Sequence, residues 1–393
     1  MRAAVFDAPG LPLRLTEVAS PSAGAGEAIL RVHSVGICGS DIHATEETGI
    51  ARRGGILGHE VAGEIVELGP APHGEWSVGD RVFVISQLSC GTCPACVERD
   101  NHRCRDLAFF GALGDDQPDG AYAELLRVRT PDLLPVPDAI PLDVAALVEP
   151  LATGLMLVRD AQIGIGDTVA VLGAGPIGLT TARWARFRGA RRVIVSEFVT
   201  YRLALAERMG ATDIVDAGAV DSVKDEVERL LGAAPDIVIE CVGRPGVFNQ
   251  AVDLVRHGGT VIAGGVCMAP DPIDHVLAYT KEPTVRFPAT YTRSENEFVM
   301  EMIEQGRIDP TPLISHTIPL DELPEAFEAL RRPTDQCKVV VNPLPAFGLI
   351  TSGCSLLTWT TPSPRTELSG ARLRSGTFGA ATIPWPSSVL APT

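Results

Sequence analysis

Long hydrophobic runs and a surplus of basic residues are missing from this 393-residue chain, and no secretion leader is expected. No stretch of about 18 uninterrupted apolar residues occurs, so no membrane-spanning helix is expected. Asp7 and Pro9 interrupt the first apolar residues, which argues against a signal peptide and for a cytoplasmic protein. Acidic residues outnumber basic ones by 49 to 33, and the net charge of −16 argues against a nucleic-acid partner.

Wholesale disorder is excluded as well, because hydrophobic residues make up 45% of the chain and charged residues only 21%. This composition is typical of a soluble globular protein with a large core. At about 150 residues per domain, the length predicts two or three domains. The nine cysteines are an odd number in a reducing compartment, so a disulfide framework is not expected.

The last 50 residues have a different composition from the rest. From 344 to 393 there are one acid, three arginines and no lysine, together with 15 Ser or Thr and six Pro. Such a segment cannot easily bury a core of its own. We therefore expect residues 343–393 to form a flexible tail, which is either biological or the product of an aberrant reading frame.

The pattern of predicted strands and helices in the body of the chain changes near residue 155. Before it, short apolar runs broken by Gly and Pro predict strands at 28–35, 63–68 and 80–85. After it, predicted strands at 168–172, 193–196, 213–215, 236–240 and 260–263 are interspersed with helices at 176–188 and 201–209. That alternation predicts a parallel sheet covered on both faces. Further on we expect helices at 295–305 and 322–330 and a closing strand at 338–341.

A glycine-rich turn of the form G-x-G-x-x-G joins the first predicted strand of this second part to its helix. Its candidate cofactor-binding residues are Gly173, Gly175, Pro176, Ile177 and Gly178. The glycines allow a tight turn, close approach of a pyrophosphate and close packing of helix on strand. Glu197 ends the next strand, where a carboxylate accepts hydrogen bonds from ribose hydroxyls and repels a 2′-phosphate, so NAD is favoured. Arg202 keeps NADP possible.

Four of the nine cysteines, Cys90, Cys93, Cys96 and Cys104, fall within 15 residues. Four thiolates suit tetrahedral zinc, and an all-thiolate set leaves no open position for a substrate. An iron–sulfur cluster is the alternative, but Arg105 stands where bacterial ferredoxin spacing carries proline. The loop is therefore predicted to hold a structural zinc ion.

A second metal site is predicted from residues that lie far apart. Cys38 and His59, with Glu60 or Glu149 as the carboxylate, would form a mixed zinc site with an open position, as catalytic sites require. Each of these residues is unremarkable alone, because a single His or Cys is more often simply packed in the core. The combination carries the prediction.

These motifs together resemble the zinc-dependent medium-chain dehydrogenase/reductase family, over residues 1–342. The motifs are C-G-S-D-x-H at 38–43, G-H-E-x2-G-x5-G at 58–69, the four-cysteine loop, E-P-L at 149–151 and the glycine-rich turn with its acid. Within the family, these motifs are most similar to those of the polyol, butanediol and threonine dehydrogenase branch. Pro72 departs from the small residue usual at that position.

The resemblance implies an α/β fold of two domains. Residues 1–153 would form a GroES-like β-barrel catalytic domain with the zinc loop at 90–104, and 154–290 a Rossmann domain with a doubly wound parallel sheet. Residues 291–342 would return to complete the catalytic domain. The family also implies two zinc ions per chain, NAD as cofactor, and a homodimer or homotetramer.

The resemblance also implies roles for individual residues. The first zinc ion would bind the hydroxyl of a small-molecule alcohol, with Glu60 the expected direct carboxylate ligand and Asp41 orienting a neighbour. Ser40 would accept the proton and pass it through the ribose to His43. Four further residues are implied beside the cofactor: Thr153 and Gly154, just after a turn at E-P-L, near the nicotinamide, and Cys241 and Val242 where the ribose passes.

The predicted function is hydride transfer between a secondary alcohol, diol or polyol and NAD. The same scaffold could instead oxidise another alcohol or an aldehyde, such as a β-hydroxy amino acid, a cyclitol or a biosynthetic intermediate. A third reading is an inactive, zinc-stabilised binding or regulatory protein, against which the intact set of Cys38, His59 and Glu60 argues.

Overall fold

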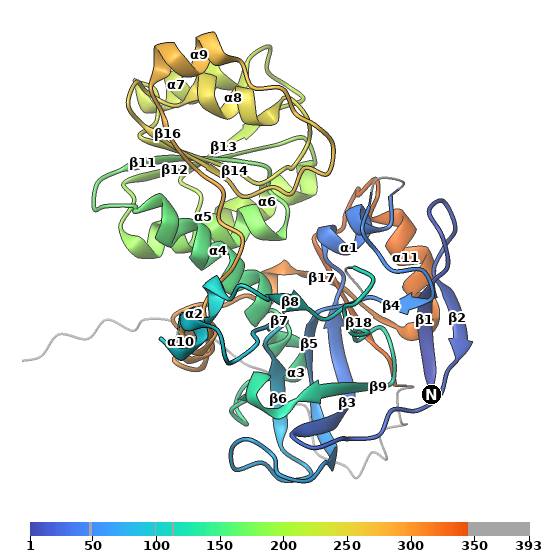
Figure 1. Cartoon of the computed structure of the whole chain (residues 1–393). Helices are drawn as coiled ribbons and strands as arrows, with labels where there is room; N and C mark the ends of the chain where they lie inside the picture. The colour runs from blue at the N-terminus through green and yellow to red at the C-terminus, as the bar shows by residue number, and fades with distance from the viewer. Residues whose placement is uncertain (47–48, 99, 112–113, 345–393) are drawn as a thin grey trace, which may run out of the picture. The chain divides into compact units, whose positions relative to one another are not determined.

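The computed structural model of the chain describes residues 1–46, 49–98, 100–111 and 114–344. Within them lie two large sheets, one from strands between residues 27 and 135 together with the last strands of the described chain, and one from strands between residues 168 and 286 (Figure 1). The predicted tail lies outside the described residues apart from 343 and 344. None of the described helices is long and apolar enough to cross a membrane.

The seven-stranded sheet combines the first 135 residues with the end of the described chain. Its strands run in the order β10, β6, β5, β3, β18, β17, with β9 also paired to β3. Their bounds are β3 Glu27–Gly36, β5 Glu60–Leu68, β6 Arg81–Val84, β9 Leu125–Arg129, β10 Leu133–Pro135, β17 Ile314–Pro319 and β18 Lys338–Asn342. Because β18 pairs with β3 at Gly36, the C-terminal strand reaches the segment that leads into Cys38.

Two small sheets accompany this one. The first has the order β2, β1, β4 and the second pairs β7 with β8. Their bounds are β1 Arg2–Phe6, β2 Arg14–Glu17, β4 Gly55–Ile56, β7 Gln87–Leu88 and β8 Ala108–Phe109. The pair β7 and β8 flanks the four-cysteine loop, which contains the short helix α2 (Pro94–Val97) and the 3-10 turn η1 (Asn101–Arg103).

The six-stranded sheet is parallel throughout, which confirms the predicted Rossmann topology. Its order is β13, β12, β11, β14, β15, β16. The chain therefore begins with β11 in the middle, adds β12 and β13 on one side, and then adds β14, β15 and β16 on the other side of β11. The strands are β11 Thr168–Leu172, β12 Arg192–Glu197, β13 Asp213–Asp216, β14 Ile237–Glu240, β15 Thr260–Ala263 and β16 Thr284–Arg286. Ligands bind at the carboxyl ends of such strands, where the order reverses.

Helices cover this parallel sheet, as its fully buried central strands require. They are α4 Val148–Ala161, α5 Pro176–Arg188, α6 Thr200–Arg208, α7 Val223–Leu231, α8 Val247–Leu254 and α9 His275–Lys281. The other helices are α1 Gly39–Ala44, α3 Leu142–Ala145, α10 Arg293–Glu304 and α11 Leu323–Ala329, with 3-10 turns η2 Thr130–Asp132, η3 Thr311–Leu313 and η4 Leu320–Glu322.

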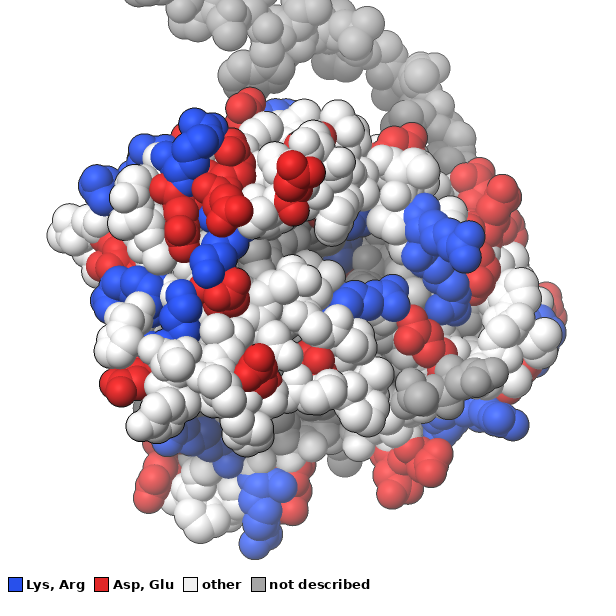
Figure 2. Space-filling model, turned by 90° about the horizontal axis from the view of Figure 1, so that it is seen from above, with Lys and Arg blue, Asp and Glu red and all other residues white. Residues whose placement is uncertain are grey.

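On the face in Figure 2, acidic and basic side chains are interspersed.

One local expectation is wrong. The Glu149-Pro-Leu segment, expected to form a turn, is the first turn of helix α4. Pro150 is tolerated there because the first N–H groups of a helix have no intrahelical acceptor, so proline removes no hydrogen bond. Glu149 is therefore carried by a rigid, buried helix, which fixes its position more firmly than a turn would.

Candidate active site

Cys38 leaves strand β3 and caps the short helix α1. The backbone N–H of Cys38 donates to Asp41 Oδ2 at 3.4 Å, so the carboxylate closes the first turn of the helix. Asp41 is fully buried and also accepts a 2.6 Å hydrogen bond from the Tyr122 hydroxyl. These bonds, with the nearby His59, hold the pKa of Asp41 below its usual value although burial alone would raise it.

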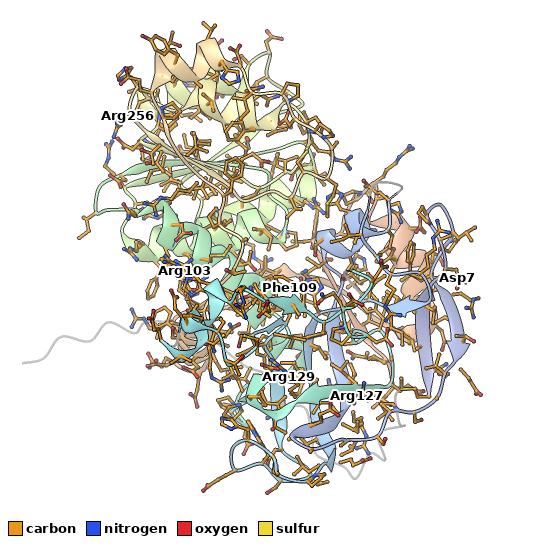
Figure 3. The ribbon with its side chains drawn as sticks, in the orientation of Figure 1. Asp7, Arg103, Phe109, Arg127, Arg129 and Arg256 are labelled. Atoms are coloured by element: carbon orange, nitrogen blue, oxygen red, sulfur yellow. The ribbon has the colours of Figure 1, made fainter. Side chains whose placement is uncertain are left out.

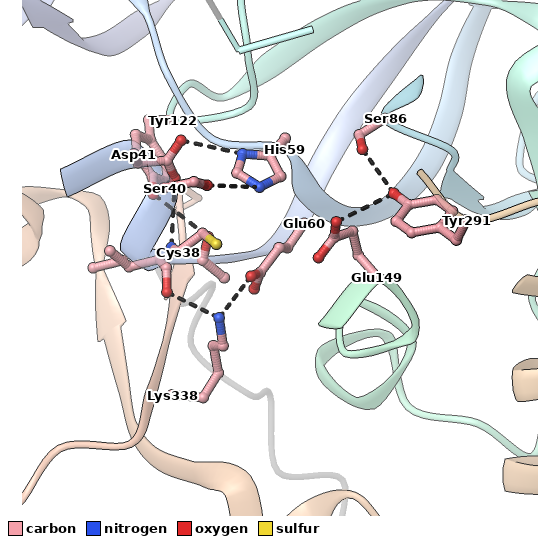
Figure 4. Close-up of polar contacts among 12 residues, drawn as sticks. Cys38, Ser40, Asp41, His59, Glu60, Ser86, Tyr122, Glu149, Tyr291 and Lys338 are labelled. Carbon is pink, nitrogen blue, oxygen red and sulfur yellow. Dashed lines mark hydrogen bonds and ion pairs between the residues drawn. The ribbon is translucent and has the colours of Figure 1, made fainter. Parts of the chain in front are cut away.

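His59 stands just before strand β5, with its imidazole aligned by Asp41 (Figure 4). Its Nδ1 lies 3.1 Å from Asp41 Oδ1, so this nitrogen carries the proton and Nε2 is the nitrogen left for another partner. Nε2 lies 3.5 Å from Ser40 Oγ. Burial lowers the pKa of His59, but the charge and hydrogen bond of Asp41 raise it well above the usual value.

Glu60 completes a compact group with Cys38 and His59, since one donor atom from each lies within 4.8 Å of the others. Glu60 Oε1 is 2.6 Å from the ammonium of Lys338, whereas Oε2 is buried without any hydrogen-bond partner. A buried, unpartnered carboxylate oxygen is costly unless a ligand pairs with it. The sulfur, nitrogen and oxygen donors and this unpartnered oxygen fit a zinc ion with an open position.

Glu149 lies outside this group of three donors, although it is close to the site. Its Oε1 accepts a 3.2 Å hydrogen bond from the Tyr291 hydroxyl, which lies 2.8 Å from Ser86 Oγ. Burial is the main cause that raises the pKa of Glu149 to about 7, and the neighbouring Glu60 adds to it. Of the two candidate carboxylates, the geometry therefore brings Glu60, and not Glu149, to Cys38 and His59.

Four side chains of this network were not among the candidates from sequence: Ser86, Tyr122, Tyr291 and Lys338. Each reaches the site from a segment far away in the chain; Lys338 is 278 residues from Glu60. No local motif marks them, because a serine, tyrosine or lysine in an apolar strand or loop is ordinary. Burial lowers the pKa of Lys338, but the Glu60 carboxylate and Cys38 raise it by more than burial lowers it. The pKa of Lys338 is therefore above its usual value, and the lysine remains charged.

The two residues of the expected proton path are not in direct contact. Ser40 points to His59, and His43 Nδ1 instead lies 3.2 Å from Glu46 Oε1 at the last turn of α1. His43 is partly exposed, with 22% of its side chain accessible. A path between the two residues therefore needs an additional group, as the expected route through the ribose assumes.

The four-cysteine loop brings its sulfur atoms together as a metal site requires. The Sγ–Sγ distances are 3.9 Å for Cys90–Cys96, 3.5 Å for Cys93–Cys96 and 3.9 Å for Cys93–Cys104. Tetrahedral zinc with bonds of about 2.3 Å places sulfur atoms about 3.8 Å apart. Backbone N–H groups of Thr92 and Cys93 lower the pKa of Cys90 to about 6, whereas burial raises the pKa of Cys96 to about 11. The four sulfur atoms, all within 4.8 Å of one another, are grouped closely enough to hold one zinc ion.

The glycine-rich turn has the geometry that nucleotide binding needs. Gly173 has φ +94°, and a Cβ on Gly178 would lie 1.9 Å from the Gly173 carbonyl oxygen, so no side chain fits there. Gly175 caps α5 with Pro176 and Ile177 in the first turn, and its Cβ position is open except for Arg202 at 4.0 Å. An open helix N-terminus of this kind accommodates a phosphate.

Glu197 ends β12 beside this turn. Its Oε2 accepts from the Ala174 N–H at 2.9 Å, and its Oε1 accepts from the N–H groups of Phe198 and Val199. The carboxylate is thus fixed at the edge of the glycine-rich turn. Arg202 donates from Nε to the Gln336 carbonyl at 2.9 Å.

Of the remaining expected cofactor contacts, Cys241 and Val242 follow the carboxyl end of β14, next to the carboxyl end of β11 where the glycine-rich turn begins. A Cβ on Gly173 would meet Val242 Cγ2 at 2.8 Å, and the Cys241 N–H donates to the Leu172 carbonyl. Burial raises the pKa of the Cys241 thiol, so it is not an activated nucleophile. Thr153 and Gly154 follow Glu149 by one turn of α4, and Gly154 packs against Thr180 of α5.

A separate cavity of about 570 Å³ lies beside the cysteine loop and is bordered by Tyr291, Arg129 and Arg293. Arg129 comes from strand β9 and is labelled in Figure 3. Arg129 is paired with the buried Asp132 at 2.6 and 2.9 Å. Arg293 donates to Glu297 and to the carbonyls of Pro131 and Leu133. Both guanidinium groups are thus satisfied within the protein, and the cavity contains none of the three clustered donors.

Comparison with known proteins gives a consistent result. Residues 24–138 match the Alcohol dehydrogenase GroES-like domain, and residues 176–305 match the Zinc-binding dehydrogenase domain. The chain is 31% identical over 339 residues to an L-threonine 3-dehydrogenase of Rhizobium rhizogenes, covering 84% of this chain and 95% of that one. It is 29% identical to a sorbitol dehydrogenase of Bacillus subtilis, covering 84% and 94%.

A solved structure with similar coverage is the alcohol dehydrogenase of Thermus sp. ATN1. It superposes with a TM-score of 0.80 at 30% identity, over 88% of this chain and all of that one. The two-sheet fold, the two candidate metal groups and these matches together define a class. The chain belongs to the zinc-dependent medium-chain dehydrogenase family, and it is an enzyme that acts on alcohols.

Proposed function

We propose that this enzyme oxidises a secondary alcohol, diol or polyol to a ketone, with NAD⁺ as the hydride acceptor. The observation that carries the proposal is the buried group of Cys38, His59 and Glu60, whose donor set leaves one coordination position open. A zinc ion held there supplies Lewis acidity toward an alcohol oxygen. The catalytic zinc ligands are thus Cys38, His59 and Glu60, with Glu149 close enough to take part after a shift.

The protein's own groups prepare this site for the reaction. Asp41 fixes the imidazole of His59 with Nε2 available, and Tyr122 in turn holds Asp41. Ser40 Oγ is the hydroxyl beside His59 Nε2 and is the group we assign to accept the substrate proton. His43, half-buried at the end of α1, would be the outer end of this path, and the ribose of a bound cofactor would fill the gap between Ser40 and His43.

We propose NAD rather than NADP, because Glu197 is a carboxylate fixed at the glycine-rich turn. A 2′-phosphate placed there meets a negative charge, whereas ribose hydroxyls find an acceptor. Arg202 is the nearest basic group to Gly175, and its Nε is held by the Gln336 carbonyl. The nucleotide contacts are assigned to Gly173, Gly175, Pro176, Ile177, Gly178, Glu197, Arg202, Thr153, Cys241 and Val242.

The four-cysteine loop holds the second zinc ion in our proposal, with a structural role. We also propose the domains 1–153, 154–290 and 291–342; the pairing of β17 and β18 with the first sheet supports the return of the last segment, and the bound after 153 lies within α4. We further propose a cytoplasmic homodimer or homotetramer. Val276, Tyr279 and Phe287 are large apolar side chains exposed near the edge strand β16, and a second copy would cover them.

A second candidate is oxidation of a β-hydroxy amino acid, which is favoured by the 31% identity to an L-threonine 3-dehydrogenase. Both candidates are tested by a screen of NAD⁺ reduction with secondary alcohols, vicinal diols, polyols and L-threonine, with zinc analysis of the same preparation. Two zinc ions per chain and turnover of one class support the proposal. One zinc ion and no turnover would instead indicate a zinc-stabilised binding protein.

A further inference from the structure

Lys338 and Glu60 form an ion pair that is completely enclosed by the protein. The ammonium Nζ lies 2.6 Å from Glu60 Oε1 and 3.0 Å from the carbonyl oxygen of Ile37, and the two side chains are 1% and 0% exposed. Ile37 immediately precedes Cys38. Lys338 therefore joins the two backbone segments that present Cys38 and Glu60.

This arrangement gives the two oxygens of the Glu60 carboxylate different surroundings. Oε1 is neutralised by Lys338, whereas Oε2 is buried and has no hydrogen-bond partner. Figure 4 shows Glu60 joined to Lys338, with the side chains of Cys38 and His59 nearby. One oxygen is thus committed to the lysine, and one is available to a cation.

The charges of the site give the lysine a specific role. Cys38 as a thiolate and Glu60 contribute two negative charges, and Lys338 compensates one of them in a region without solvent. If an uncharged side chain stood in place of the lysine, Glu60 would be an uncompensated buried carboxylate, which is strongly unfavourable. A divalent cation would then be the remaining partner able to relieve that cost.

We propose that Lys338 is a positioning residue that holds Glu60 with a single free oxygen and limits how tightly this carboxylate binds zinc. The proposal rests on the metal site assigned above to Cys38, His59 and Glu60. A carboxylate shared with a lysine is a weaker donor than a free one, so the site keeps a position at which a substrate oxygen competes. Lys338 acts through Glu60 and needs no contact with substrate.

The test replaces the charge and retains the apolar stem, with Lys338→Met. Zinc affinity of each site is measured by chelator competition, and the four-cysteine site of the same chain is the internal reference. We expect the Cys38 site of this variant to bind zinc at least about tenfold more tightly, equivalent to about 1.4 kcal/mol. The absorption spectrum of cobalt(II) at that site shifts with the changed carboxylate, and Lys338→Arg restores both measurements.

Lys224→Met is the matched control, because Lys224 is paired with Asp253 and partly exposed on α7. It should leave zinc affinity at both sites unchanged. A merely structural role predicts the opposite of our result, namely weaker zinc binding in Lys338→Met as the site loosens. Unchanged or weaker affinity in a folded variant overturns the proposal.

A variant that fails to fold is replaced by Lys338→Gln, which keeps a hydrogen-bond donor without the charge and should also bind zinc more tightly. Zinc titration of the wild-type chain distinguishes failure of the proposed metal site from failure of the proposed role of Lys338. A wild-type chain that binds only one zinc ion, at the four cysteines, overturns the metal site itself. Two zinc ions with no effect of Lys338→Met overturn only the role of the lysine.

Discussion

The contact between Asp41 and His59 can be tested by removing one charge without changing shape. Asp41→Asn keeps the size of the side chain but loses the charge that faces His59 Nδ1 at 3.1 Å. The amide also has to find partners for its own N–H groups in a fully buried place, where Tyr122 already donates to the present oxygen at 2.6 Å. The imidazole therefore loses the charged acceptor that orients it.

The expected magnitude follows from two independent arguments. A hydrogen bond to a charged group contributes about 1.5–3 kcal/mol, which corresponds to a factor of about 10–150. Loss of the hydrogen-bond partner of a metal-ligating histidine typically costs about 10–100-fold in metal affinity or activity. We therefore expect Asp41→Asn to weaken zinc binding at the Cys38 site, and kcat/KM, by about 10–100-fold.

The assay is zinc competition with a chelator, run together with steady-state kinetics under zinc-saturating conditions. The four-cysteine site should keep its affinity, since its sulfur atoms have no contact with Asp41 among the hydrogen bonds of the described residues. Asp321→Asn serves as the control, because Asp321 is an exposed partner of Arg2. If zinc affinity and kcat/KM of Asp41→Asn both stay within twofold of wild type, the positioning argument is wrong.

Three other outcomes are expected. Glu197→Ala should raise the NADP to NAD ratio of kcat/KM by about tenfold or more, because the carboxylate that repels the 2′-phosphate is gone; a wild type that already prefers NADP contradicts this. Cys93→Ser should lower zinc content from two to one per chain and reduce the thermal midpoint, whereas Cys267→Ser, outside both groups, should do neither. Burial raises the folded-state pKa of Glu149 from 4.5 to about 7, so the metal-free chain binds more protons folded than unfolded. Its stability should therefore fall by up to about 3 kcal/mol between pH 4.5 and 7 in urea unfolding, and Glu149→Gln should flatten that dependence.

The sequence by itself determined the features that local chemistry defines. The four sulfur atoms come from one short loop, so their spacing alone indicated the metal that they fit. The turn from Gly173 to Gly178 excludes side chains through its own backbone, and the alternation of strands and helices determined the parallel sheet. These features depend on residues close together in the chain, which is why a pattern could reveal them.

Only the tertiary structure decided which carboxylate joins Cys38 and His59. The resemblance already favoured Glu60 over Glu149 as the direct ligand, and the packing of the chain places an oxygen of Glu60 within 4.8 Å of the donor atoms of Cys38 and His59, whereas Glu149 stands on α4 outside this group. Lys338 reaches Glu60 because β18 pairs with β3, a contact between strands about 300 residues apart. Long-range pairing of this kind depends on the burial of whole sheets and leaves no mark in any short stretch of sequence.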